Sequence, residues 1–124
     1  MPIVQLPDNN FSKLIIYRTR YTHEDTAFFT KVITDQSTIK KLYSDIKSSD
    51  FWKPGVYNCP EDNGIEYVLN FYSNDVLTVH SILNVTGCRS IRFTKYTGRR
   101  ASSSLIEDLQ QTLDLSKQEF YGYQ

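Results

Sequence analysis

The sequence lacks several features that would point directly to a function. Among its 124 residues there are only two cysteines and two histidines, with no CxxC pair, so we expect neither a metal site nor a cofactor. No apolar run reaches the length of about 18 residues that a transmembrane helix needs. Lys plus Arg and Asp plus Glu both total 14, and this zero net charge argues against a specific nucleic-acid binder.

The composition is that of a globular protein, with 40% apolar and 23% charged residues. The length fits one domain, residues 1–124, because two cores of half that size would each be marginal. Pro2 and Pro7 predict an extended lead-in over residues 1–12. Residues 116–124 are aromatic without a clear period, and we expect an irregular tail there.

The first half of the chain predicts a hairpin followed by a helix. Lys13 to Arg20 and Ala27 to Ile33 are rich in β-branched and aromatic residues and are separated by a polar turn. The period then changes, because apolar residues recur at helical spacing from Ile39 to Ile46. Thr34 or Asp35 can cap the start of this helix, which should end near residues 48 and 49.

The second half predicts further strands and a second helix. Polarity alternates in two segments, Ile65 to Tyr72 and Val76 to Val85. A three-residue loop between these two strands sets a register that pairs Leu69 with Val79. A short strand around residues 56–59 and another over residues 90–96 are also expected. Residues 97–100 resemble a turn, and residues 104–107 fit a capping box that opens a helix.

The expected order is β-β-α-β-β-β-β-α. Short connections make neighbouring strands antiparallel, and each helix has one apolar face. The sequence therefore predicts an α+β domain: an antiparallel sheet of five to six strands with two amphipathic helices on one face.

Cys59 and Cys88 are expected to form a disulfide. The predicted register places Pro60 opposite Cys88, within reach of a bridge from the neighbouring cysteine. Such a bridge closes a loop of about 30 residues and contributes about 3–4 kcal/mol. Disulfides persist in oxidising compartments, so we expect an extracellular or cell-surface protein, although no signal peptide is visible at the N-terminus.

The outer face of the predicted sheet is mixed in polarity and is the expected interaction surface. Its candidate binding residues are Glu66, Asn70, His80 and Asn84. The register sets His80 diagonal to Glu66 and Asn70, so a small hydrolase using His80 and Glu66 is an alternative. No nucleophile motif accompanies that pair, and no catalytic residue is assigned.

A cluster of positive charge follows Cys88. Arg89, Arg92, Lys95, Arg99 and Arg100 include no acid among them and can attract an anionic polymer or an acidic protein surface. The alternative is a solvated edge strand, where positive charges oppose edge-to-edge pairing. The arginines of this cluster complete the candidate binding residues.

One segment carries a resemblance. A Cys-Pro-x-Asp-x-Gly turn, a Tyr-x-Leu-x-Phe strand and a closing Gly-Cys pair are formed by Cys59, Pro60, Asp62, Gly64, Tyr67, Leu69, Phe71, Gly87 and Cys88. The pattern resembles small, mostly uncharacterised secreted proteins and lipoproteins of bacteria and covers about a quarter of the chain. The resemblance implies a disulfide-bearing envelope domain, compatible with a lipid anchor upstream, and implies no activity.

The expected function is therefore a non-enzymatic, secreted or surface-anchored domain that binds a protein or an anionic envelope polymer. A cytosolic inhibitor or immunity-type interaction protein is a further alternative, which free thiols would favour. The oligomeric state and the identity of the ligand do not follow from the sequence.

Overall fold

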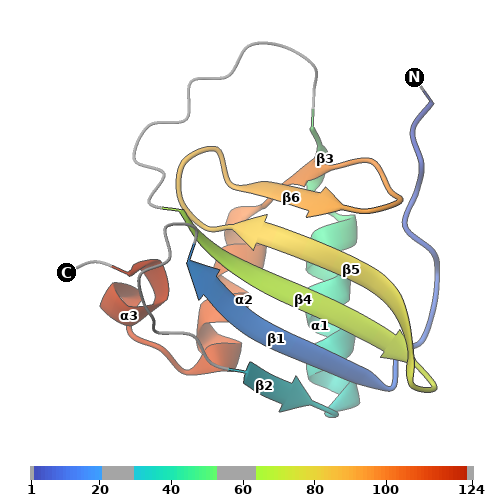
Figure 1. Cartoon of the computed structure of the whole chain (residues 1–124), viewed down its shortest axis with the longest axis horizontal. Helices are drawn as coiled ribbons and strands as arrows, with labels where there is room; N and C mark the ends of the chain where they lie inside the picture. The colour runs from blue at the N-terminus through green and yellow to red at the C-terminus, as the bar shows by residue number, and fades with distance from the viewer. Residues whose placement is uncertain (1, 21–29, 53–63, 123–124) are drawn as a thin grey trace.

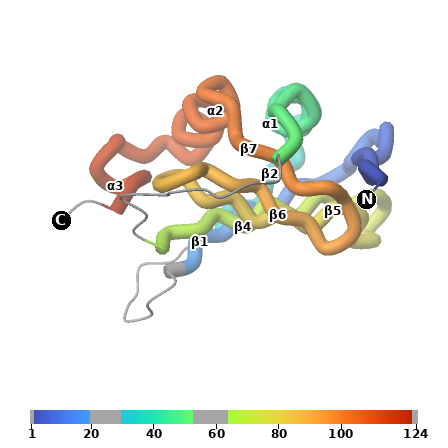
Figure 2. The backbone as a smooth tube through the Cα atoms, turned by 90° about the horizontal axis from the view of Figure 1, so that it is seen from above, coloured from blue at the N-terminus to red at the C-terminus, as the bar shows by residue number. Residues whose placement is uncertain are grey.

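The computed structural model describes residues 2–20, 30–52 and 64–122. In these residues seven antiparallel strands form one sheet in the order β2-β1-β4-β5-β6-β7-β3, and α1 and α2 cover one face of it (Figures 1 and 2). The α+β prediction is confirmed. The strands are β1 (Lys13–Arg20), β2 (Thr30–Ile33), β3 (Asp50–Phe51), β4 (Ile65–Ser73), β5 (Val76–Asn84), β6 (Ser90–Phe93) and β7 (Arg99–Arg100). The helices are α1 (Gln36–Lys47), α2 (Ser103–Leu113) and α3 (Lys117–Tyr121).

The centre of the sheet is formed by β1, β4 and β5, where residues alternate between the two faces. Tyr67, Leu69 and Phe71 of β4 are fully buried toward the helices. The predicted pairing of β4 with β5 is wrong by two positions, because Tyr67 faces Leu83 and Leu69 faces Ser81. A shift of two residues keeps every side chain on its predicted face, since strand side chains alternate with a period of two.

The cause of the shift is the hairpin turn. The loop contains two residues, Asn74 and Asp75, and not three, and both have positive φ, 48° and 67°. Asn and Asp tolerate this conformation, and a two-residue turn of this kind matches the twist of the paired strands. An irregularity between Phe71 and Tyr72 then moves the ladder into its observed register.

Local caps define the helices. Asp35 accepts the backbone N–H of Thr38 and begins α1, as one of the two predicted caps. The cap of α2 is Ser102, which accepts the N–H of Leu105, so the box predicted over residues 104–107 starts two residues late. The capping oxygen of Ser102 lies next to the first turn of α2 and satisfies a donor that the helix leaves open.

The C-terminal tail is not wholly irregular, and this prediction is corrected. Ser116 and Glu119 form a reciprocal capping box that starts α3. Phe120 is fully buried and stacks on Tyr67 with ring centroids 4.9 Å apart. The Tyr67 hydroxyl donates to the carbonyl of Phe120 at 2.7 Å, so α3 is fixed to β4.

Two of the strands were not predicted. β3 and β7 have two residues each and pair with one another, Asp50 with Arg100 and Phe51 with Arg99. Residues 99 and 100 were expected to belong to a turn. The predicted strand over residues 90–96 is shorter and ends at Phe93. The strand expected around residues 56–59, the first residues of the strand expected from Ala27, and Cys59 lie outside the described residues.

Candidate functional site

The sheet has one face that no described helix covers. We call it the open face, and Figure 1 looks onto it. The pairings of β1 with β2, β4 with β1, β5 with β4 and β6 with β5 place one set of alternate residues there. The set comprises Ile15, Tyr17, Val32, Glu66, Val68, Asn70, His80, Ile82, Asn84 and Arg92.

The open face is built in cross-strand rows. One row runs through Val32, Ile15, Asn70 and His80. The next row runs through Tyr17, Val68, Ile82 and Arg92.

Apolar side chains form the middle of the open face. Val68 is only 4% exposed although no described helix lies over it, whereas Val32 at the β2 edge is 57% exposed. The face thus combines a shielded apolar centre with an accessible apolar margin. Such a combination is typical of protein interfaces, where an apolar patch is framed by polar groups.

Asn70 and His80 form one polar pair on this face. They are directly opposite each other on β4 and β5, and His80 Nδ1 lies 2.6 Å from Asn70 Oδ1. Asn70 is 8% exposed, so the pair satisfies a buried amide in the middle of the sheet. The Asn70 oxygen accepts from the Nδ1 position, which fixes the tautomer and the ring orientation of His80.

Glu66 forms the second polar pair, and this overturns the proposed hydrolase dyad. Glu66 Oε2 bonds Arg92 Nη2 at 2.5 Å, and Glu66 faces Asn84 across the strands. Residue 80 faces residue 70, four positions along the strand from residue 66, which corresponds to about 13 Å. His80 and Glu66 therefore cannot exchange a proton directly.

The basic cluster divides into different environments. Arg92 is neutralised by Glu66, and Lys95 and Arg100 are exposed. Arg89 is half-buried and has a positive φ of 57°, because it forms the turn between β5 and β6.

Arg99 is not a surface cation, which corrects its assignment to the binding set. It is 4% exposed, and one guanidinium nitrogen donates to the carbonyls of Lys47 and Ser49, each at 2.9 Å. The guanidinium also lies 4.1 Å from the ring centroid of Phe51. Burial lowers the pKa of Arg99. Arg99 closes the C-terminal end of α1, whose last carbonyls have no partner inside the helix.

The structure reveals a titratable pair that the sequence analysis missed. Asp45 of α1 and Asp108 of α2 are hydrogen-bonded across the helix pair, and Lys41 Nζ lies 3.3 Å from Asp108. Burial, followed by the hydrogen bond and charge of Asp108, raises the pKa of Asp45 to about 7. The hydrogen bond from Asp45 lowers the pKa of Asp108. The two carboxyl groups therefore differ in how readily they ionise, although they lie side by side on the helical side of the sheet.

Comparison with protein-family models, curated proteins and solved structures finds no match for this chain. The resemblance of residues 57–88 to bacterial envelope proteins therefore stays a prediction. In the described part of the chain no three His, Cys, Asp or Glu side chains gather as metal ligands, and no helix has the length and apolar character to cross a membrane.

The disulfide also stays a prediction. Cys88 follows β5 and is 9% exposed. Its expected partner, Cys59, lies outside the described residues.

Sequence reasoning found the β4 and β5 part of the open face but missed the contribution of β1 and β2. Glu66, Asn70, His80 and Asn84 do share one face, as predicted. Ile15, Tyr17 and Val32 join them because β1 pairs with β4. The alternation in Lys13–Arg20 shows that Ile15 and Tyr17 share a face, but only the non-local pairing shows which face.

Proposed function

We propose that this protein is a non-enzymatic binding domain whose open face engages a protein partner. The observation that supports the proposal is the exposed apolar margin at Val32, continuous through Ile15 and Tyr17 with the shielded centre of the sheet. Polar pairs interrupt this apolar surface, and their geometry gives a partner specific contacts as well as buried area.

A protein partner fits the charge distribution better than an anionic polymer does. Of the five cations in the basic cluster, Arg99 is buried and Arg92 is paired with Glu66. Arg89, Lys95 and Arg100 remain, and they do not lie together on one strand. Polymer binding by counterion release depends on many exposed cations in one track, which this arrangement does not offer.

We also propose that the domain acts outside the cell, secreted or attached to the cell surface. This part of the proposal depends on the predicted disulfide between Cys59 and Cys88, since such bridges persist in oxidising compartments. Free thiols in the native protein would favour the cytosolic inhibitor instead.

Site-specific photo-crosslinking tests the open face. A benzophenone amino acid is placed at Val32 on the open face, and at Glu107, an exposed residue of α2, as the matched control. Each protein is irradiated with an extract and the culture medium of the cells that produce it. We expect one protein adduct of discrete mass from position 32 and none from position 107.

Competition makes the result specific. Excess wild-type protein should abolish the adduct, and the Ile15→Glu variant should not, because it places a charge on β1 directly opposite Val32. Circular dichroism establishes that the variant is folded. Equal adducts from both positions, an adduct that resists competition, or no protein adduct at all would contradict the proposal.

A further inference from the structure

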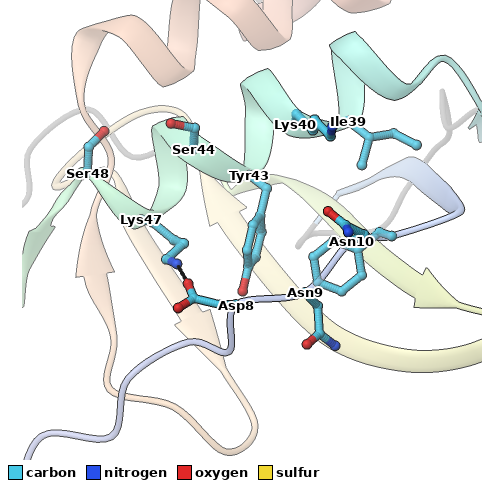
Figure 3. Close-up of a pocket in the computed structure, with 10 residues that line it drawn as sticks. Asp8, Asn9, Asn10, Ile39, Lys40, Tyr43, Ser44, Lys47 and Ser48 are labelled. Carbon is cyan, nitrogen blue, oxygen red and sulfur yellow. Dashed lines mark hydrogen bonds and ion pairs between the residues drawn. The ribbon is translucent and has the colours of Figure 1, made fainter.

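On the helical side of the sheet, a groove runs between residues 8–11 and α1. Two contacts join its walls: the Tyr43 hydroxyl donates to the Pro7 carbonyl at 2.5 Å, and Lys47 forms an ion pair with Asp8 (Figure 3). The other side chains labelled in this view point in different directions, so they do not converge on one ligand. The edge of the sheet carries a more regular set of unpaired groups.

The sheet ends at β2, and one side of this strand pairs with no other strand of the described residues. β2 is the first strand in the sheet order and bonds only β1 (Figure 1). The strand at the opposite end, β3, has two residues, whereas β2 has four. An edge strand carries a row of backbone N–H and C=O groups with which a further strand can pair. β2 is therefore the longer of the two free edges.

The hydrogen-bond pattern of the sheet shows which residues of β2 direct their backbone outward. In an antiparallel sheet each residue points both its N–H and its C=O to one side, and that side alternates along the strand. The Ala101 N–H donates to the Arg89 carbonyl at 2.8 Å, which sets the alternation where β6 pairs with β7. Following the registers from β6 through β5, β4 and β1 assigns Lys31 and Ile33 to the bonds with β1.

Thr30 and Val32 therefore direct their backbone N–H and C=O groups away from the sheet. Both residues are exposed. Thr30 faces Tyr17 and Val32 faces Ile15 across the pairing with β1, so both side chains lie on the side of the open face. A strand bonded to Thr30 and Val32 would extend two rows of the open face by one residue each.

The edge of β2 lacks the features that usually protect a free strand. Native edges are blunted by proline, by a β-bulge or by a lysine that places its charge at the edge. β2 contains no proline, and its register with β1 is regular. The ammonium of Lys31, its one charged residue, donates to the Thr112 carbonyl near the end of α2 at 2.9 Å. Lys31 therefore closes a helix end and does not guard the edge.

The groups on this edge match one kind of ligand. Donors and acceptors that repeat every two residues, about 7 Å along one line, match the backbone of another extended chain. We propose that β2 is a docking edge that accepts an extended segment of a protein partner as an added strand. The segment pairs with Thr30 and Val32 through its main chain, and an apolar side chain in it packs against Val32. The inference rests on the proposed function, since Val32 belongs to both surfaces, and it names how the partner is held.

The test is a nuclear magnetic resonance titration of the full-length ¹⁵N-labelled protein with a synthetic peptide. The peptide alternates valine and threonine, has blocked ends and carries a lysine at each end for solubility. In the control peptide proline replaces each threonine, because proline cannot donate to a strand. We expect saturable shifts that are largest at the backbone amides of Thr30 and Val32, with slower hydrogen exchange of both. The proline peptide should leave these amides unchanged.

Matched variants separate the backbone from the side chain. Thr30→Pro removes a donor that points outward and leaves the bonds between β2 and β1 in place, whereas Thr30→Ala keeps that donor. We expect Thr30→Pro to bind the valine–threonine peptide about three- to tenfold more weakly, as for the loss of one hydrogen bond, and Thr30→Ala to bind as the wild type does. Val32→Pro should likewise bind more weakly than Val32→Ala. Circular dichroism establishes that each variant is folded.

Several results would overturn the inference. Equal binding of the two peptides would show that backbone pairing is not involved. Absence of shifts at Thr30 and Val32 would exclude strand addition at β2. A Thr30→Pro variant that binds as tightly as Thr30→Ala, with Val32→Pro as tight as Val32→Ala, would exclude it as well.

Crosslinking distinguishes a failure of this inference from a failure of the proposed function. Thr30→Pro is added in excess as a competitor of the adduct formed at position 32. Weaker competition than by Thr30→Ala would support strand addition by the partner. Competition equal to that of the wild type would leave the open face as the binding surface and remove the added strand. No adduct at position 32, together with peptide bound at Thr30 and Val32, would remove the proposed function and leave the docking edge in place.

Discussion

Replacing Arg99 with methionine removes a buried guanidinium and leaves the aliphatic part of the side chain in place. In the wild type one guanidinium nitrogen donates to the carbonyls of Lys47 and Ser49, both at 2.9 Å. The Lys47 carbonyl belongs to the last residue of α1 and the Ser49 carbonyl to the turn that follows, and Arg99 itself is 4% exposed. Methionine offers no donor, so both carbonyl oxygens lose their partner.

The expected loss of stability can be worked out from these contacts. A hydrogen bond that involves a charged group contributes about 1.5–3 kcal/mol, so the two bonds together contribute about 3–6 kcal/mol. The cost of burying the guanidinium, which also lowers the pKa of Arg99, offsets part of this. We expect Arg99→Met to lower the free energy of unfolding by about 2–4 kcal/mol, which for a domain of this size lowers Tm by about 10 °C.

The assay is urea unfolding followed by circular dichroism, with two comparison variants. Arg100→Met changes the exposed neighbour in the same strand and should alter stability by less than about 0.5 kcal/mol. Arg99→Lys keeps the charge but not the planar donor group, so its stability should lie between wild type and Arg99→Met. If Arg99→Met costs no more than Arg100→Met, the role assigned to Arg99 at the end of α1 is wrong.

Three further predictions concern the tail, the helix pair and the cysteines. Tyr67→Phe removes the hydroxyl that donates to the Phe120 carbonyl, and should cost about 1–2 kcal/mol in urea unfolding; an unchanged stability would contradict the docking of α3. The pKa of Asp45 is raised to about 7, so the stability from its protonated form is lost as the pH rises from about 4 to about 7. Asp45→Asn does not titrate, and should therefore become more stable relative to wild type between pH 5 and pH 8; a constant difference would show that Asp45 is ionised throughout. Mass spectrometry after alkylation should find Cys59 and Cys88 protected until the protein is reduced. Alkylation of both cysteines without reduction would contradict the predicted disulfide and the proposal that the domain acts outside the cell.

The placement of Arg99 also affects how binding experiments are interpreted. An Arg99 variant that loses binding reports first on the end of α1, because the side chain has no access to a partner. Arg100 and Lys95 are exposed and test the charge of this region directly. Of the basic cluster, Arg89, Lys95 and Arg100 therefore remain as candidates for contact with a binding partner.

The candidate sites differ in how far the sequence could predict them. Alternation of polarity in residues 65–72 and 76–85 was enough to place Glu66, Asn70, His80 and Asn84 on one face, because this pattern is local and has a period of two. The pairing of His80 with Asn70 depended on the register, which the conformation of Asn74 and Asp75 decided. Polarity patterns do not specify the length of a turn to one residue.

Longer-range relations could not be read from the pattern. The groove is formed by residues 8–11 and α1, which are nearly 30 positions apart in the chain. The effect of Asp108 on the pKa of Asp45 requires α1 and α2 to lie side by side. Residues 50–51 and 99–100 form strands only because the fold brings the two segments together. Strands of two residues carry no periodic signal in the sequence.

The sequence by itself determined the α+β class, the faces of the central strands and the extent of α1, because these follow from side-chain period and from caps within a few residues. Tertiary structure alone decided the register, the burial of Arg99, the docking of α3 and the free edge at β2. Each of these depends on contacts between segments distant in the chain, whose free energy is set by complementary packing and hydrogen bonding and not by any local pattern.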